Sequence, residues 1–478
     1  MLFNSIDFAI FLPIVFLLYW FVAQNNLRLQ NLLIVVVSYI FYGWWDYRFL
    51  SLIVFSTIID YTVGVLLSKE KSITKRKVYL WISIVINLGF LGFFKYYNFF
   101  LDNFVTAFSF FGQSISGNSL KIILPVGISF YTFQTLSYSI DVYKNKLEPT
   151  KDFIAFSAFV CFFPQLVAGP IERATNLLPQ FYKRRFFDKE QAIDGLHLFI
   201  WGLFKKIVIA DSCAVYVNTI FENYENLNSL SLFLGAVYFA FQIYGDFSGY
   251  SDMAIGLSKF FGFNLMKNFN YPYFSRDIAE FWRRWHISLS TWFRDYLYIP
   301  LGGSKGNKLK QVRNVFVIFV VSGFWHGANW TYIIWGFLNA LFFIPLLVIN
   351  KNRKNIDIVA STSFFPNIYD FIKMLVTFLM VVLAWVIFRA DSISTAIKYL
   401  TKIFQVNFDG GINYLSIERY SVENLLLIFV FIFIEWISRK ESHPFFGKHI
   451  LVKISFVLIS LFLFGVYSQA KDFIYFQF

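Results

Sequence analysis

Long apolar stretches recur from the first residues of the chain almost to its last. A membrane-spanning helix needs ~20 mainly apolar residues. Several stretches reach that length, while others are shorter or interrupted by glycine and polar residues. We therefore expect an all-α polytopic membrane protein with about 11 transmembrane helices. The candidate spans are 6–23, 31–47, 49–67, 78–96, 121–140, 195–220, 229–248, 313–325, 328–350, 369–389, 421–438 and 452–469.

The charged fraction supports this interpretation. Only 15% of the residues are charged and 57% are apolar, whereas a soluble protein has roughly 25% charged residues. The same composition excludes a disordered chain, a collagen-like fibre and a secreted disulfide scaffold. The two cysteines, Cys161 and Cys213, lie in apolar runs and are expected to be small buried side chains.

Basic residues orient the spans. The chain carries a net charge of +13, and Lys and Arg gather in the cytoplasmic loops of membrane proteins. The loops 69–77, 144–151 and 183–189 are therefore assigned to the cytoplasm, and the loop 99–120, which has no Lys or Arg, to the outer side. This use of the charge favours topology over nucleic-acid binding, so we expect no nucleic acid as a partner.

The apolar stretch 153–168 lies between two cytoplasmic loops and is expected to be re-entrant. Such a backbone is tolerated at membrane depth only where protein or a water-filled cavity surrounds it. The sequence shows no internal repeat, low-complexity tract or linker. We therefore expect residues 1–478 to form a single domain.

An amphipathic helix is predicted at 281–294, in a region without a clean spanning run. Its tryptophans and Leu289 share one side, as expected for a helix that lies in the headgroup layer. A position in the headgroup layer accounts for the arginines on its polar side, which can contact anionic lipid. The histidine among them is compatible with either a structural or a functional role. The polar side comprises Arg283, His286, Ser290 and Arg294.

A second histidine, His326, lies between two apolar segments that both return to basic loops, hence inside a membrane hairpin. Ionisable groups at that depth are costly and usually face a cavity or a partner. Gly323 and Gly327 beside it allow close approach. A neutral imidazole there could take a proton from a hydroxyl that attacks an ester or thioester. The alternative is a histidine hydrogen-bonded to a neighbouring helix.

Two carboxylates, Asp246 and Asp252, end an apolar run. They are candidates for reactive groups, but a structural role is favoured, with Asp252 capping a helix and Asp246 paired with an arginine. No histidine has a companion at metal-ligand spacing, and the motifs of phosphate-binding loops, serine hydrolases and zinc proteases are absent. We expect no metal site.

Several longer motifs resemble the membrane-bound O-acyltransferase family, most closely its bacterial branch that O-acetylates alginate. The likeness extends over nearly the whole chain. The motifs are 124–130 (LPVGISF), 163–172 (FPQLVAGPIE), 246–256 (DFSGYSDMAIG), 268–273 (NFNYPY), 281–290 (FWRRWHISLS), 292–303 (WFRDYLYIPLGG), 323–330 (GFWHGANW) and 473–478 (FIYFQF).

The resemblance implies a ring of helices around a thinned centre, with re-entrant and interfacial helices. It implies that His326 is catalytic and that His286 is its usual upstream companion. His326 would act as general base, and donors that include His286 would polarise the carbonyl oxygen. The net charge of +5 between Arg276 and Arg313 would attract an anionic donor. Substrate contacts are then expected from Arg283, Arg284, Ser290, Arg294, Trp325 and Asn329.

The implied activity is O-acetyl transfer from a cytoplasmic thioester, either acetyl-CoA or a phosphopantetheine carrier, with no bound cofactor. The acyl group would pass to an extracytoplasmic polysaccharide or to a partner acetyltransferase, and the protein would be a multi-pass protein of the bacterial inner membrane, surrounded by lipid. One alternative is the D-alanyl transfer branch of teichoic acid modification, which shares the 281–295 core (FWxRWHxSLSxWFRD). Asp252, the 298–303 stretch and the C-terminal residues favour acetylation.

A transporter or channel, with intramembrane His and Asp residues along its path, is the alternative of another class. It predicts paired inverted halves, which the sequence does not show, and it leaves the Trp- and Arg-rich segment without a use.

Overall fold

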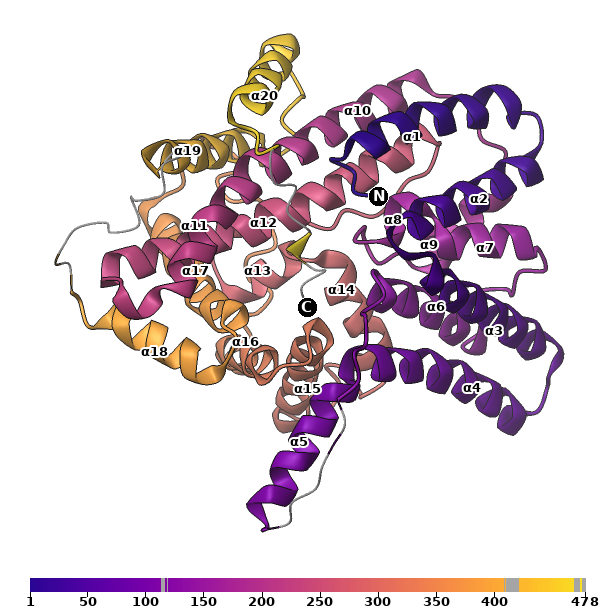
Figure 1. The fold of residues 1–478 in the computed structure, drawn as a ribbon, viewed down its shortest axis with the longest axis horizontal. Helices are drawn as coiled ribbons and strands as arrows, with labels where there is room; N and C mark the ends of the chain where they lie inside the picture. The colour runs from indigo at the N-terminus through magenta and orange to yellow at the C-terminus, as the bar shows by residue number, and fades with distance from the viewer. Residues whose placement is uncertain (113–116, 118, 408, 410–420, 468–472, 475–478) are drawn as a thin grey trace. The chain divides into compact units, whose positions relative to one another are not determined.

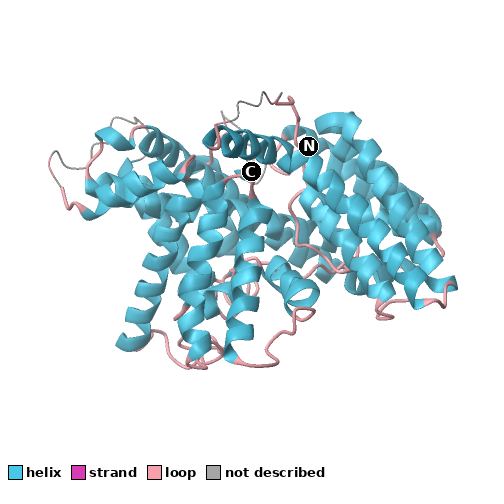
Figure 2. Cartoon of the chain, turned by 90° about the horizontal axis from the view of Figure 1, so that it is seen from below, coloured by secondary structure: helices cyan, strands magenta, loops and turns pink. Residues whose placement is uncertain are grey.

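The computed structural model describes residues 1–112, 117, 119–407, 409, 421–467 and 473–474, and among these residues the regular elements are helices. Figures 1 and 2 show these helices joined by loops. Contacts within the chain divide it into two units, Met1–Leu196 with Ala254–Met266, and His197–Met253 with Lys267–Phe478. The single domain that we expected stays a prediction.

The first unit holds the N-terminal helices. Their starts follow ordinary capping rules, because Ser5, Asn26 and Asp152 each accept backbone N–H groups of the first turn that follows. The helices are α1 (Ile6–Leu17), α2 (Leu27–Asp46), α3 (Leu50–Lys69), α4 (Ile73–Leu91), α5 (Tyr97–Phe110), α6 (Ile128–Tyr143), α7 (Phe153–Cys161), α8 (Phe163–Leu166) and α9 (Ala174–Leu177).

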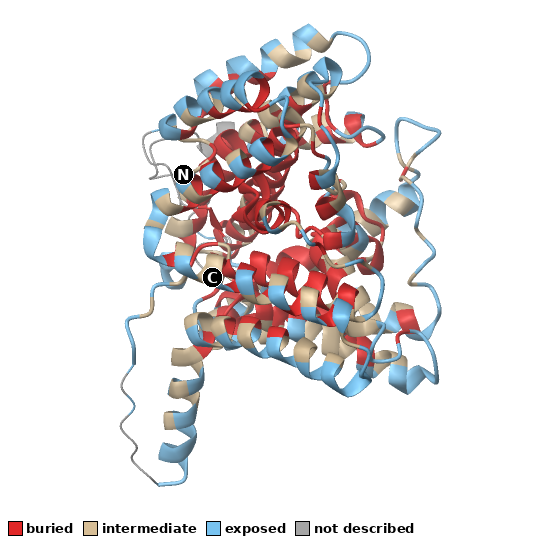
Figure 3. Cartoon of the chain, turned by 90° about the vertical axis from the view of Figure 1, so that its right-hand side faces the viewer, coloured by how far each residue is buried: buried red, intermediate tan, exposed pale blue. Residues whose placement is uncertain are grey.

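Two predictions for this unit were wrong in their boundaries. The region 99–120, expected to be an outer loop, begins within α5, a helix that has no buried residue and whose residues are of intermediate exposure or exposed (Figure 3). The span expected at 121–140 begins only at Ile128, because Pro125 and the left-handed Gly127 (φ 73°) precede it. The stretch 153–168 forms α7 and α8, and its re-entrant path stays a prediction.

The second unit holds the helices of the C-terminal half. Two long helices, α10 (Lys189–Phe204) and α12 (Ser229–Phe260), have residues in both units. The others are α11 (Asp211–Glu222), α13 (Ile278–Arg284), α14 (Ile287–Phe293), α15 (Lys308–His326), α16 (Trp330–Val348), α17 (Ile368–Arg389), α18 (Ile393–Phe404), α19 (Ser421–Ser438) and α20 (Ile450–Phe464). Helix α12 continues twelve residues beyond the predicted end at 248, and α18 was not predicted.

Helices α15 and α16 approach closely through glycines. A Cβ atom at Gly323 would lie 2.2 Å from the Tyr332 carbonyl oxygen, and one at Gly336 would lie 2.3 Å from the Phe319 carbonyl oxygen. Small residues allow helix backbones to meet in this way inside membranes. The short turn between these helices is therefore rigidly placed, and His326 is the last residue before it.

Five helical segments in the described part of the chain are long and apolar enough to cross a bilayer. Shorter apolar helices add further candidates at Ile6–Val22, Phe153–Leu166, Asn424–Ser438 and Ile450–Phe464. This supports a multi-pass membrane protein, while the count of 11 and the ring stay predictions. The five segments are Leu27–Lys69, Ile73–Phe110, Ser229–Phe260, Trp330–Val348 and Ile368–Arg389.

Candidate active site

The predicted amphipathic helix at 281–294 is two short helices. Helix α13 ends at Arg284, α14 begins at Ile287, and His286 between them has a left-handed backbone (φ 44°, ψ 55°). Left-handed conformations interrupt the helical repeat. The continuous polar face that we predicted from spacing does not exist, and His286 takes its direction from the break instead.

His286 is held by Asn268. The imidazole is 1% exposed, and its Nδ1 lies 3.1 Å from the Asn268 side-chain oxygen. The same oxygen accepts hydrogen bonds from the backbone N–H of Ser288 (3.2 Å) and from its hydroxyl (2.9 Å). The Asn268 amide nitrogen donates to the Ser251 hydroxyl over 3.1 Å.

These contacts determine the tautomer of His286. A backbone N–H can only donate, so the atom of Asn268 that faces Ser288 must be the amide oxygen. Since an amide oxygen only accepts, Nδ1 of His286 carries the hydrogen that it donates. The other ring nitrogen, Nε2, then has a lone pair in the neutral imidazole.

The surroundings of His286 favour the neutral ring. Burial lowers the pKa of His286 well below its usual range, and the neighbouring His326 lowers it further. Desolvation acts this way because it disfavours the charged form of a base. His286 is therefore a neutral hydrogen-bond acceptor at Nε2.

His326 lies at the C-terminal end of α15 and is 4% exposed. Its ring centroid is 6.5 Å from that of His286. Aromatic rings from three helices surround it, namely Trp325 (5.1 Å), Trp335 (5.3 Å) and Phe388 (5.5 Å). The fold thus brings together two histidines that lie forty residues apart in the sequence, in a water-poor aromatic setting.

A cavity of about 450 Å³ in the second unit is lined by Gly327, the residue that follows His326, but not by His326 itself. The Asn329 side chain lies in its wall, where its oxygen caps α16 by accepting from Thr331 N–H and its nitrogen donates to the Asp391 carbonyl oxygen. Asn329 therefore shapes the cavity next to the histidine. The lining residues are Gly327, Ala328, Asn329, Tyr332, Arg389, Ala390 and Asp391.

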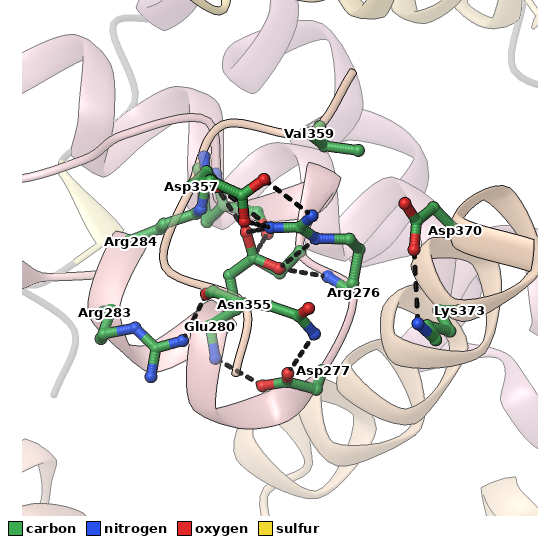
Figure 4. Close-up of polar contacts among 12 residues, drawn as sticks. Arg276, Asp277, Glu280, Arg283, Arg284, Asn355, Asp357, Val359, Asp370 and Lys373 are labelled. Carbon is green, nitrogen blue, oxygen red and sulfur yellow. Dashed lines mark hydrogen bonds and ion pairs between the residues drawn. The ribbon is translucent and has the colours of Figure 1, made fainter. Parts of the chain in front are cut away.

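Arg284 is part of a buried ion-pair cluster (Figure 4). It lies 2.7 Å from Glu280, which also pairs with Arg276 at 3.1 Å, and Arg276 reaches Asp357 at 2.9 Å. The charge of Arg284 is thus neutralised within the protein. The cluster holds the loop that contains Asp357 against α13, and the substrate contact predicted for Arg284 stays a prediction.

The other polar residues predicted to touch substrate are also engaged by the protein. Arg283 donates to the carbonyl oxygens of Asn352 and Asn355, both at 2.7 Å, and Figure 4 shows it beside Asn355. The exposed Arg294 pairs with its neighbour Asp295 at 2.7 Å, and the Ser290 hydroxyl donates to the Trp285 carbonyl oxygen over 3.4 Å. The substrate contacts predicted for these three side chains stay predictions.

Asp246 and Asp252 are structural, but not with the predicted partners. Lys206 pairs with Asp246 at 2.7 Å, and Lys205 pairs with Asp252 at 2.7 Å. Both lysines are buried and follow directly after α10. Asp252 lies inside α12 and caps no helix, and the arginine expected for Asp246 is replaced by a lysine. Helix α12 is thereby joined to the segment after α10.

Sequence reasoning missed Asn268, Ser288 and Ser251 as supports of the site. Asn268 was available as the first residue of the NFNYPY motif at 268–273, which we quoted only for its resemblance. Among the described residues, no group of three or more His, Cys, Asp and Glu side chains is arranged to hold a metal ion.

Comparisons with known proteins give one consistent result. The model of the membrane-bound O-acyltransferase family matches residues 144–388. The "Probable alginate O-acetylase AlgI" of Pseudomonas aeruginosa is 40% identical over 407 residues, which is 84% of this chain and 75% of the relative. The "Peptidoglycan O-acetyltransferase" of Helicobacter pylori is 36% identical, covering 85% of this chain and 80% of the relative.

A more distant similarity connects the chain to the alternative branch. The "Teichoic acid D-alanyltransferase" of Bacillus subtilis is 29% identical over 232 residues, which is 46% of this chain and 58% of the relative. The likeness to the O-acetylating relatives is therefore both higher and longer.

Proposed function

This chain belongs to the membrane-bound O-acyltransferase family and is an acyltransferase, and from that premise we propose its donor, its acceptor and the roles of its two histidines. The acyl group is acetyl, and it moves from a thioester on the cytoplasmic side to a hydroxyl on the extracytoplasmic side. The observation that carries this proposal is the pair of buried histidines, 6.5 Å apart between ring centroids, beside the cavity that Gly327 lines.

His326 is the general base. The acceptor hydroxyl attacks the thioester carbonyl carbon, a C–O bond forms, the C–S bond breaks, and the hydroxyl proton passes through the base to the departing thiolate. An aromatic, desolvated surrounding suits this task because it strengthens each polar contact made at the reacting atoms. Trp325 contributes as part of that aromatic wall.

His286 is assigned a role that differs from our expectation. Because its Nδ1 already donates to Asn268, the neutral ring has no second N–H with which to stabilise a carbonyl oxygen. Its Nε2 lone pair instead accepts a hydrogen bond from the ring N–H of His326, which leaves the other ring nitrogen of His326 to take the proton of the acceptor hydroxyl. We therefore propose that His286 orients the His326 ring, and that the oxyanion is stabilised by other donors.

The donor is acetyl-CoA or an acetylated phosphopantetheine carrier, bound as a substrate. Both are anionic, so basic side chains on the cytoplasmic side favour their approach. With Arg276, Arg283 and Arg284 engaged by protein groups, the exposed Lys305 and Lys310 are the better candidates for this attraction. The protein acts as a multi-pass protein of the bacterial inner membrane.

The acceptor is a polysaccharide, reached directly or through a partner acetyltransferase outside the membrane. The relatives support this class, since one is named as a probable alginate O-acetylase and another as a peptidoglycan O-acetyltransferase. D-alanyl transfer to teichoic acid is the second candidate, supported by a likeness over 46% of this chain.

His326→Ala tests the proposal. It should abolish polymer O-acetylation, measured by mass spectrometry of the cell's glycans, with an unchanged protein level in the membrane. His449→Asn is a matched control, since His449 is exposed, has a left-handed backbone (φ 60°) that asparagine tolerates, and is absent from the site. Normal acetylation in His326→Ala would overturn the assignment. Loss of a D-alanyl ester in this variant, with acetylation unchanged, would favour the second candidate.

A further inference from the structure

A basic cavity of about 1030 Å³ lies in the first unit, where the turn η4 (Leu178–Tyr182) leads into α10. Four basic and two acidic side chains face it, an excess of +2. The basic residues are Lys183, Arg184, Arg185 and Lys189, and the acidic ones are Asp188 and Glu190.

The basic side chains of this cavity are available to a ligand. Lys183, Arg184 and Lys189 are exposed, and none of them has an ion pair with an acid among the described residues. Arg185 supplies a fixed positive charge in the wall, because it is buried, donates to Asn31 over 2.7 Å and lies over the Phe263 ring at 4.7 Å.

One of the two acids has a local partner. The carboxylate of Asp188 accepts the backbone N–H groups of Glu190 and Gln191, at 2.9 and 3.1 Å, and so caps the start of α10. The negative charge of Asp188 is thus used at the N-terminus of α10, where the helix dipole favours an anionic side chain. The exposed charged side chains that line the cavity are three basic and two acidic ones, and the buried Arg185 adds a fourth positive charge.

An apolar groove of about 400 Å³ adjoins the basic cavity, and the two share Phe187 and Lys189 as lining residues. The Phe187 ring is 5.9 Å from that of Phe16 and is 49% exposed. The remaining lining residues are Leu12, Pro13, Phe16, Ala192, Ile193, Leu196 and Phe260.

We propose that the cavity and the groove form one binding site for an anionic phospholipid of the cytoplasmic leaflet, with the phosphate among the basic side chains and an acyl chain in the groove. A basic pocket that continues into an apolar groove matches a ligand with a charged head and a long apolar tail. Loop 183–189 is basic and predicted to be cytoplasmic, where anionic lipids are concentrated. An acetyl thioester carries phosphates but has no long chain to fill the groove.

The test measures lipid retention by the full-length protein. The protein is purified in detergent, incubated with phosphatidylcholine vesicles that contain phosphatidylglycerol, and its bound lipids are counted by native mass spectrometry. The variant Lys183→Gln/Arg184→Gln/Lys189→Gln removes three charges from the site. The control Lys71→Gln/Lys75→Gln/Lys77→Gln removes three exposed charges from another basic loop of the same unit.

Wild type and control should retain phosphatidylglycerol over phosphatidylcholine, and the site variant should lose that preference by roughly tenfold or more. Equal retention by site variant and control would overturn the proposal. Displacement by inorganic phosphate as effective as by the lipid, or displacement by acetyl-CoA, would also overturn it, because the site would then bind an anion without a tail or the donor. If the triple variant fails to fold, the single variants Lys183→Gln and Arg184→Gln replace it, with the same outcomes.

Discussion

Asn268→Ala is the change that most directly tests how the site works. The Asn268 amide oxygen receives three hydrogen bonds, from Nδ1 of His286 and from the N–H and hydroxyl of Ser288, at distances of 3.1, 3.2 and 2.9 Å. Alanine removes this acceptor and leaves the histidine free to move its hydrogen to Nε2. Both the orientation and the tautomer of His286 then lose their support.

The expected magnitude follows from the number and burial of these bonds. A neutral hydrogen bond contributes about 1 kcal/mol, so losing three should lower the free energy of unfolding by about 3 kcal/mol. A buried donor without an acceptor costs about 1–3 kcal/mol. If the unsatisfied His286 N–H raises the free energy of the transition state by this amount, the rate of acyl transfer drops roughly 5- to 150-fold.

The assay follows thiol release from the acetyl thioester by purified protein with acceptor present. Ser251→Ala is the control, because it removes the partner of the Asn268 amide nitrogen but leaves the contact with His286. The tautomer is read separately by ¹⁵N NMR of labelled histidine, of which the chain has only five. In Asn268→Ala the Nε2 signal of His286 should move toward the protonated position.

Two results would refute this reasoning. A wild-type rate in Asn268→Ala would show that the contact with His286 has no part in transfer. A lost rate with an unchanged His286 tautomer would mean that Asn268 acts only through stability.

Glu280→Gln should lower the free energy of unfolding by about 3–5 kcal/mol, because it leaves the buried Arg276 and Arg284 without their shared countercharge. Thermal unfolding measures this, and a loss equal to that of Asp357→Asn, whose side chain is 63% exposed, would contradict it. Burial holds the pKa of His286 below its usual range. Below about pH 6.5 the imidazole therefore binds a proton in the unfolded chain but stays neutral in the folded chain. The free energy of unfolding should fall as the pH drops below about 6.5. His286→Gln should lack this part of the pH dependence, and identical unfolding profiles at about pH 5 and 7.5 for both proteins would refute it.

Much of this protein could be predicted from consecutive residues. Apolar length is a local property, and it located most of the helices because a helix bonds its own backbone. The motifs around His286 and His326 were likewise readable, and the family that they indicated is confirmed by the comparisons. Local patterns were less successful at boundaries, as at α12, which continues to Phe260.

The partners of the polar side chains were decided by the tertiary structure. Asn268 reaches His286 across 18 positions, Lys205 reaches Asp252 across 47, and Arg276 reaches Asp357 across 81. Spacing along one helix carries no information about such pairs, because they depend on which helices pack together and how closely. Residue types therefore indicated acid–base chemistry by histidines within a membrane protein. Packing determined which nitrogen of His286 carries its hydrogen and which arginines contact other groups of the protein.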